Sequence, residues 1–423
     1  MIYIRNAAQV VTMAGPNGKP RTGAAMSELG LVENGGVVLE GENVAFVGPD
    51  DEARRFVERR GAVPEVIDAS GKLVAPGLVD PHTHVVFAGS REQELNMRLS
   101  GATYMEIMNA GGGIHSSTER TREASEERLL RETAKRLDRF LEHGVTTIEA
   151  KSGYGLRLED ELKQLRVARR LNDEHPVDLV STFMGAHAVP KEYKADPEGY
   201  VRLVTDAMIP AVASQGLAEY CDVFCEKGVF TPEQSRAILE AGMKRGLKPK
   251  IHADEIEPYG GGELAAEIGA VSAEHLLRVS DAGIRAMAEK GVIAVLLPGT
   301  AFFLMTKPAE ARRMIEAGVP VALSTDRNPG SCPTESLPFV MNLACLTMKM
   351  TPAEVLTACT INAAHAIGRA GRIGSLEAGK QADVVVFDAP NYLYLQYHYA
   401  VNLVDTVVKK GRVVISDRRR TDR

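Results

Sequence analysis

The sequence contains no tryptophan, and it carries no excess of positive charge. Its 50 lysines and arginines stand against 56 aspartates and glutamates, so the formal net charge is -6. Binding to nucleic acid or to an anionic membrane surface depends on clustered lysine and arginine, which this chain lacks. We interpret the one short basic run, residues 418–420, as a frayed terminus. We therefore expect neither nucleic acid nor a membrane as a partner.

Long apolar runs and a disulfide framework are also missing. No run reaches the roughly 18 apolar residues that a membrane-spanning helix needs, and residues 1–5 do not begin a signal peptide. The five cysteines are odd in number and scattered, which fits reduced thiols better than disulfides. Cys221 and Cys225 flank a short apolar segment and no second cysteine pair follows, so we assign them no metal. These absences predict a cytoplasmic protein.

The chain does have enough apolar content, 44% of 423 residues, for one large domain and a smaller one. Between about residues 73 and 374, short apolar runs alternate with helical patterns. Eight such runs can be counted: 73–79, 145–150, 178–184, 221–225, 249–252, 270–275, 292–297 and 320–324. Eight alternating strand and helix units with nearly continuous apolar strands predict a parallel (β/α)8 barrel of the TIM type.

Two helical segments illustrate the pattern between these runs. Leucine and alanine at positions 130, 134, 137 and 141 have helical spacing, and Gly144 follows as a stop signal. Thr351 and Glu354 have the spacing of a capping box, with proline at the first helical position.

The two chain ends have a different pattern, of short strands joined by tight turns. Residues 38–47 form a hairpin pattern about Gly41, and residues 382–388 and 404–415 form strands with a turn at Lys410. Neither end is large enough to fold alone, so we expect one small discontinuous β-sandwich. The predicted domains are residues 1–72 plus 375–423 for the β-sandwich and residues 73–374 for the barrel.

Two histidines, His82 and His84, directly follow the first predicted barrel strand. Residues two apart in an extended strand point to the same side, so this pair can offer two imidazoles to one metal ion. Histidines also occur in strands as ordinary packed residues, so the pair needs support from elsewhere in the chain. In a β/α barrel that support should stand at the carboxyl ends of the other strands, where active sites form.

Ionisable and polar residues follow five further predicted strands, in the segments 151–154, 185–187, 252–255, 274–275 and 324–326. Each segment alone could be structural, but their shared position favours a catalytic site. Three nitrogens and one oxygen would make a mononuclear metal site with room for water. The predicted ligands are His82, His84, His252 and Asp326. Zinc and ferrous iron both accept such ligands, so we predict one metal ion per chain, zinc or iron.

Three residues at these strand ends can take part in catalysis. Asp326 can accept a proton from the attacking water and pass it to a leaving nitrogen. His275 can orient that water or polarise a carbonyl group. Glu255 can hydrogen-bond a substrate N–H or act as acid or base, and a supporting role at a helix N-terminus is the alternative.

Three other polar residues are candidates for holding a substrate. Arg91 lies in the first loop, where its guanidinium could bind a substrate carboxylate through two parallel hydrogen bonds, with a solvated loop arginine as the alternative. Tyr154 and His187 could be packed at the barrel rim, but each can place a polar group over the same cavity. Residues 109–113 lack the strand and lysine of a phosphate loop, so we interpret them as a mobile loop over the barrel mouth.

These motifs together resemble the amidohydrolase superfamily, from the chain ends through the whole barrel. Five blocks are also similar to the imidazolonepropionase family of histidine degradation, namely residues 81–91, 151–155, 183–187, 252–255 and 324–331. The resemblance implies metal-dependent hydrolysis of 4-imidazolone-5-propanoate, a cyclic amide with a carboxylate arm, to N-formimidoyl-L-glutamate. It implies the four metal ligands named above and a homodimer. It also implies contacts to substrate or product from Arg91, Tyr154, His187, Glu255, Asn328, Gly330 and Ser331.

Other functions stay open at this point. A deaminase or another cyclic-amide hydrolase of the same superfamily could use the same ligands, and a barrel can also serve as a non-catalytic scaffold. A scaffold has no need of three histidines and an aspartate at its strand ends, so it is the weakest alternative. Some amidohydrolases bind two metals bridged by a modified lysine after the fourth strand. Lys227 stands near that point, but no second ligand set accompanies it, so we expect one metal.

Overall fold

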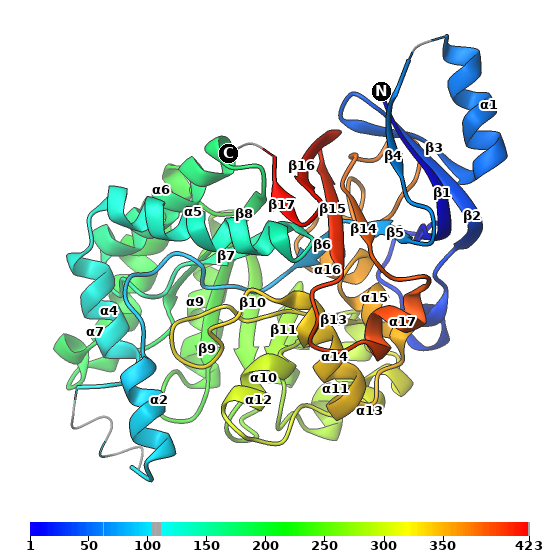
Figure 1. The fold of residues 1–423 in the computed structure, drawn as a ribbon. Coiled ribbons are helices and arrows are strands. Elements are labelled where there is room, and N and C mark those ends of the chain that lie inside the picture. The colour runs from blue at the N-terminus through cyan, green and yellow to red at the C-terminus, as the bar shows by residue number, and fades with distance from the viewer. Residues whose placement is uncertain (62, 103–105, 107–110, 422–423) are drawn as a thin grey trace.

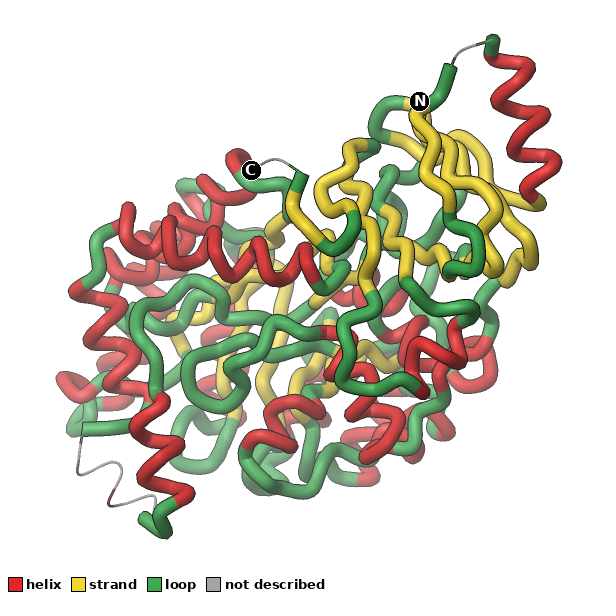
Figure 2. The backbone as a smooth tube through the Cα atoms, viewed as in Figure 1, coloured by secondary structure: helices red, strands yellow, loops and turns green. Residues whose placement is uncertain are grey.

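The computed structural model describes residues 1–61, 63–102, 106 and 111–421. These residues form an eight-stranded parallel sheet and a nine-stranded mixed sheet. Figures 1 and 2 show the mixed sheet at one end of the molecule, built from both ends of the chain, while helices surround the parallel sheet. Within the described part of the chain, no helix has both the length and the apolar character needed to cross a membrane.

Neighbouring strands of the parallel sheet are consecutive in the chain, as a (β/α)8 barrel requires. Its strands are β6 (Leu78–Asp80), β7 (Val145–Lys151), β8 (Asp178–Ala186), β9 (Tyr220–Cys225), β10 (Lys248–Ala253), β11 (Ser272–His275), β12 (Ile293–Leu296) and β13 (Val321–Leu323). The segments that follow β6 and β13 meet, because His82 O accepts from Asp326 N at 3.1 Å and Arg327 O accepts from His84 N at 2.9 Å. The predicted barrel is confirmed.

Helices follow the barrel strands along the chain, both between them and after the last one. They are α2 (Glu92–Leu99), α4 (Ile114–Glu123), α5 (Glu126–Glu142), α6 (Leu158–Glu174), α7 (Pro197–Leu203), α8 (Ile209–Ser214), α9 (Pro232–Lys244), α10 (Gly261–Glu267), α11 (Asp281–Lys290), α12 (Pro298–Phe303), α13 (Ala311–Glu316), α14 (Leu337–Met348), α15 (Pro352–Ala358) and α16 (Ile361–Ala366). Helix α5 is the one predicted before Gly144. The predicted capping box starts α15, since Thr351 Oγ1 accepts from Glu354 N and Glu354 Oε2 accepts from Thr351 N.

The mixed sheet joins the two chain ends. From the amino end come β1 (Ile2–Val11), β2 (Leu31–Glu40), β3 (Asn43–Pro49), β4 (Glu65–Asp68) and β5 (Leu73–Pro76), with helix α1 (Asp50–Arg60). From the carboxyl end come β14 (Val384–Phe387), β15 (Val404–Lys409), β16 (Arg412–Ser416) and β17 (Arg419–Arg420), with helix α17 (Tyr392–Tyr397). Antiparallel pairing of β5 with β14 connects the two sets. Apolar residues of both sets, among them Ile4, Val37, Val386 and Val408, form one buried cluster. The small discontinuous β-sandwich predicted from both chain ends is confirmed as a separate β-unit, which consists of one mixed sheet.

The apolar run 73–79, predicted as one barrel strand, is instead two strands in two different sheets. Strand β5 pairs with β1 and β14 in the mixed sheet, and only β6 belongs to the barrel. The break falls at Gly77, where the backbone N–H donates to Asp383 O at 2.9 Å and where a side chain would collide with Thr146. The domain limits at 72/73 and 374/375 stay a prediction, although β5 lies on the barrel side of the first limit.

The mixed sheet contacts the barrel at the amino end of strand β8. Nζ of Lys409 lies 2.7 Å from a carboxylate oxygen of Asp178, at the start of β8, and 2.7 Å from one of Asp383. Lys410 adds a second ion pair to Asp178 at 2.5 Å. We call these four residues the seam cluster. Because it occupies the amino end of the barrel, the carboxyl ends of the strands face away from the mixed sheet.

Candidate active site

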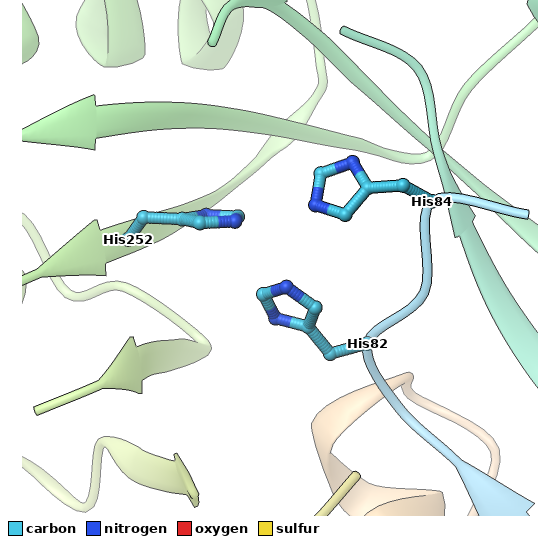
Figure 3. A group of neighbouring side chains, drawn as sticks. All are labelled: His82, His84 and His252. Atoms are coloured by element: carbon cyan, nitrogen blue, oxygen red, sulfur yellow. The ribbon is translucent and has the colours of Figure 1, made fainter. Parts of the chain in front are cut away.

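Five side chains of metal-ligating types come together at the carboxyl ends of the barrel strands. They are His82, His84, His252, His275 and Asp326, and each is at most 3% exposed. One ligand atom from each of His82, His84 and His252 lies within 4.8 Å of the others, and the same holds for His82, His275 and Asp326. Figure 3 shows the first three imidazoles projecting toward one another from β10 and from the segment after β6. The structure thus brings together all four predicted metal ligands.

Buried carboxylates contact two of these imidazoles at the ring nitrogen Nδ1. Nδ1 of His82 lies 2.5 Å from Oε2 of Glu274, and Nδ1 of His252 lies 3.1 Å from Oδ1 of Asp222. A carboxylate that accepts from Nδ1–H fixes the ring and leaves a lone pair on Nε2. This is the usual support for a histidine that binds a metal through Nε2.

The Nε2 atoms of the same two histidines are buried and have no hydrogen-bond partner among the described residues. Nε2 of His82 lies 3.4 Å from Oδ1 of Asp326, and Nε2 of His84 lies 3.9 Å from that oxygen. Buried polar atoms without partners are costly and rare in folded proteins. Imidazole lone pairs gathered around a carboxylate oxygen fit a divalent cation, so these residues suit the predicted metal.

Burial governs the protonation of this cluster. It lowers the pKa of His82, His84 and His275 well below the usual value, so these imidazoles are neutral, as metal binding requires. Burial also raises the pKa of Asp326 to about 6, although Thr300 Oγ1 donates to its Oδ2 at 2.6 Å.

The backbone at the cluster is strained. His275 and Asp326 have φ angles of 69° and 54°, in the left-handed region that residues other than glycine seldom adopt. Such conformations persist only where the surrounding structure imposes them, and they concentrate at functional sites. The strain therefore supports a functional role for the ends of β11 and β13.

A cavity of about 460 Å³ opens beside the cluster. His84, His252, His275 and Asp326 line it. All the predicted substrate contacts line the same cavity, namely Arg91, Tyr154, His187, Glu255, Asn328, Gly330 and Ser331. A metal-type cluster and a set of polar groups for a small ligand therefore share one space, as expected of an enzyme pocket.

Arg91 is already paired within the protein. Its Nε and Nη2 donate to one carboxylate oxygen of Glu94 at 2.9 and 2.7 Å. Its Nη1 approaches Gly330 so closely that any side chain at position 330 would overlap it. A substrate carboxylate can therefore bind Nη1 directly, or it can take the place of Glu94.

Aromatic contacts arrange the rim on the opposite side. The rings of His84 and His187 stack at 4.7 Å with an interplanar angle of 9°. Tyr154 meets His187 edge to face at 5.3 Å, and Nδ1 of His187 lies 3.0 Å from Gly153 O. Burial lowers the pKa of His187 to about 3, so this imidazole is neutral, and with Nδ1–H donating to Gly153 O its Nε2 can accept one hydrogen bond from a ligand.

Glu255 is an acidic residue of the cavity whose pKa is strongly raised. Its Oε1 lies 3.5 Å from Nδ1 of His275. Burial raises the pKa of Glu255 to about 8, and the charges of Asp326 and Glu226 add to the effect. A carboxylic acid that keeps its proton at neutral pH can serve as a general acid.

Two buried glutamates that sequence reasoning missed hold the loops of this site. Glu226, just after β9, accepts from the backbone N–H groups of residues 255–257 at 2.8–3.3 Å. Glu161, in the first turn of α6, accepts from those of residues 153, 155 and 156 at 2.7–3.0 Å. They position the loops of Glu255 and Tyr154. Nothing in the sequence marks these pairings, which join different strands and helices.

Two other predictions concern the surroundings of the cavity. Lys227 is 64% exposed and pairs with Glu257 at 2.8 Å, so its side chain does not join the histidine cluster. Part of the predicted loop 109–113 lies outside the described residues. Within the part described, Gly113 N donates to Glu94 Oε1 at 3.0 Å.

Comparisons with known proteins agree with this geometry. The amidohydrolase family matches residues 73–414. The imidazolonepropionase of Shouchella clausii is 67% identical over 415 residues, which cover 98% of this chain and 93% of that protein. The imidazolonepropionase of Geobacillus kaustophilus is 66% identical over 417 residues, 98% of either chain.

Solved structures show the same fold at low identity. A mutant atrazine chlorohydrolase from Arthrobacter aurescens, complexed with zinc and atraton, aligns with a TM-score of 0.75 at 17% identity, covering 100% of this chain and 97% of that one. An adenosine deaminase from Xanthomonas campestris with bound zinc aligns with a TM-score of 0.74 at 19% identity, covering 100% and 94%.

Proposed function

The chain belongs to the amidohydrolase family and, within it, to the imidazolonepropionases, and on this basis we propose that it hydrolyses 4-imidazolone-5-propanoate to N-formimidoyl-L-glutamate. The observation that carries the proposal is the shared cavity, which joins a metal-type cluster to the guanidinium of Arg91. A cyclic amide with a propanoate arm needs a hydrolytic centre and an anchor for its carboxylate, at a short distance from each other.

One metal ion, zinc or iron, is the cofactor that we propose. The residues that would hold it are His82, His84, His252 and Asp326, and the unpartnered Nε2 atoms of His82 and His252 support this. A divalent ion bound there supplies a water molecule that ionises near neutral pH and a positive charge for the carbonyl oxygen.

The side chains around the ion divide the proton transfers of hydrolysis. Water adds to the ring carbonyl carbon, the C–N bond breaks, and the leaving ring nitrogen takes a proton. Asp326 receives the proton of the attacking water on its carboxylate, which Thr300 Oγ1 holds in place by donating to Oδ2. Glu255 holds its own proton at neutral pH and delivers it to the nitrogen. His275, whose Nδ1 lies 3.5 Å from Oε1 of Glu255, polarises the ring carbonyl beside it.

Substrate binding falls to the rim of the cavity. Arg91 binds the propanoate carboxylate, and Tyr154 and His187 contact the ring. Asn328 shapes the loop beside Arg91, because its Oδ1 accepts from Gly330 N at 2.8 Å and from Ser331 N at 2.7 Å. Asn328 Nδ2 donates to Ser331 Oγ at 2.8 Å, so the proton of the Ser331 hydroxyl stays available for a hydrogen bond to the ligand.

The second candidate is a deaminase of the same superfamily. No feature among the described residues of the cavity favours it over the proposed hydrolase. The test is to supply the purified protein with freshly made 4-imidazolone-5-propanoate and to measure N-formimidoyl-L-glutamate, with a chelator-stripped sample alongside. We expect product that depends on metal. A metal-replete sample that forms no product would refute the proposed substrate, and neutral amidines such as purines would then be the next to test.

A second copy of the same chain is the partner that we propose, together with a cytoplasmic location. Apolar and aromatic side chains are exposed on and near α14 and α17: Leu346, Leu393, Tyr397, Tyr399 and Val401. Soluble monomers seldom expose such groups side by side. Sedimentation equilibrium should give twice the chain mass, and a monomer at micromolar concentration would contradict this.

A further inference from the structure

A row of charged side chains lies inside the barrel, deeper than the histidine cluster. Its five members come from β7, β9, β10 and β11, and their side chains have no solvent exposure: Glu149, Lys151, Asp222, Lys250 and Glu274. Buried charges are costly unless they are paired. Their arrangement therefore needs an explanation beyond the filling of space.

The first half of the row starts at His252. Asp222 uses one oxygen for each neighbour: Oδ1 lies 3.1 Å from Nδ1 of His252, and Oδ2 lies 2.6 Å from Nζ of Lys151. Nζ of Lys151 in turn lies 3.0 Å from Oε2 of Glu149. The second oxygen of Glu149, which also accepts from Thr182 Oγ1, continues the row.

The second half ends at His82. Oε1 of Glu149 lies 3.0 Å from Nζ of Lys250, which lies 3.7 Å from Oε1 of Glu274. Oε2 of Glu274 lies 2.5 Å from Nδ1 of His82. Acidic and basic side chains thus alternate from His252 to His82, with 2.6–3.0 Å between charged neighbours except for the ion pair of Lys250 with Glu274 at 3.7 Å. We call these five residues the ion chain.

We propose that the ion chain is a single positioning unit that couples the orientation of His82 to that of His252. Each terminal carboxylate faces a histidine with one oxygen and a lysine with the other, and the lysine Nζ lies 2.6 Å away at Asp222 and 3.7 Å away at Glu274, so rotation of either carboxylate disturbs both contacts. Further hydrogen bonds fix them, from Ser272 Oγ to Glu274 at 2.5 Å and from His252 N to Asp222 at 3.2 Å. The two Nε2 atoms are then aimed at a common point before a metal arrives.

This inference concerns metal binding and does not depend on the proposed substrate. If the ion chain only filled the barrel interior, the two histidines would respond independently to changes in their own carboxylates. If it couples them, a substitution of one terminal carboxylate should also loosen the histidine at the other end of the ion chain. The two cases differ in a double-mutant cycle.

The experiment measures the zinc dissociation constant of the metal-free full-length protein by competition with a chromophoric chelator. Asp222→Asn and Glu274→Gln should each weaken zinc binding by about 10- to 100-fold, as removal of such histidine partners does. Together they should weaken it by at least about threefold less than the product of the single losses. Glu149→Gln, which touches neither histidine, should weaken zinc binding severalfold and remove this coupling.

The matched control is Thr300→Val, which removes a hydrogen bond from Asp326 but no member of the ion chain. In the double variant with Asp222→Asn, the fold-loss of zinc affinity should equal the product of the two single losses. Circular dichroism of the metal-free variants shows whether they fold. Should Glu149→Gln unfold, its combination with Lys250→Met removes one charge of each sign and is expected to give the same loss of coupling.

The proposal is overturned if the zinc affinity lost in the Asp222→Asn, Glu274→Gln double variant equals the product of the single losses, as in the control pair. A folded Glu149 variant that keeps the original zinc affinity and the original coupling also overturns it. Failure of the proposed hydrolysis would leave these zinc measurements unaffected, so the two proposals can fail separately.

Discussion

The two ends of the barrel both bury ionisable side chains, but they treat them differently. At the amino end, Lys409 is 2% exposed and lies 2.7 Å from each of two carboxylates, Asp178 and Asp383. At the carboxyl end, Nε2 of His82 and of His252 have no partner among the described residues. Paired charges stabilise the fold, whereas buried imidazole nitrogens without hydrogen-bond partners stay available to a ligand. The comparison shows where stability and reactivity are located in this chain.

The largest effect should follow from a change at the carboxyl end. Asp326→Asn removes the proposed proton acceptor and one proposed metal ligand, so turnover should fall by about 1,000-fold or more. Because the seam cluster is untouched, the melting temperature of the metal-free protein should stay within a few degrees of the original. Steady-state kinetics measure the turnover, and calorimetry measures the melting temperature. A variant that binds metal and keeps its turnover would contradict the assignment.

The opposite result is expected at the amino end. Lys409→Met leaves the buried carboxylate of Asp383 without its cation and Asp178 with Lys410 alone, which should lower the free energy of unfolding by about 3–5 kcal/mol. Urea denaturation measures this loss. The folded fraction should keep the original kcat/KM, because no residue of the cavity is changed. A large fall in kcat/KM with unchanged stability would show that the two ends are not separate.

Arg91 sharpens the comparison within the cavity. Arg91→Gln removes the charge that we assign to the substrate carboxylate, so KM should rise by about 10- to 100-fold while kcat changes less. The rise in KM should be smaller for a substrate analogue without the propanoate arm. Kinetics on the pair of substrates provide the measurement, and equal losses on both would remove Arg91 from substrate binding.

The smallest effect concerns acid stability at the seam. Burial alone would raise the pKa of Asp178, but the charge of Lys409 and hydrogen bonds from Lys409, Lys410 and Gln381 lower it to about 2, against 3.8 for an unperturbed aspartate. The carboxylate therefore stabilises the fold fully above pH 4–5, by about 2 kcal/mol, and this contribution disappears as the pH falls toward 2. Unfolding experiments across this range should show a shallower loss for Asp178→Asn. An identical pH profile for both proteins would refute the ion pair.

Much of this organisation could be predicted from the sequence, because it depends on repeated local patterns. Alternating apolar runs and helices predict the barrel, and the barrel places its strand ends together. His82, His252 and Asp326 are far apart in the sequence, yet they meet in the structure for that reason. The site could be predicted because the topology converts scattered strand ends into neighbours.

The parts that could not be predicted depend on packing between elements. The run 73–79 is apolar throughout, so the change of sheet at Gly77 leaves no signal in its hydrophobicity. Glu226 and Glu161 look like ordinary loop and helix acids, although each accepts from several buried backbone N–H groups. The ion chain is equally hidden, because its pairs join neighbouring strands whose register the sequence does not give.

The most direct test of the account is a zinc titration of the metal-free protein with N-formimidoyl-L-glutamate formation as the readout. The account predicts that activity rises linearly to one equivalent of zinc per chain and then stays constant. It predicts the same endpoint for folded Lys409→Met and no rise for Asp326→Asn. Product formation without metal, or an endpoint at two equivalents, would contradict a single metal centre at the carboxyl end of the barrel.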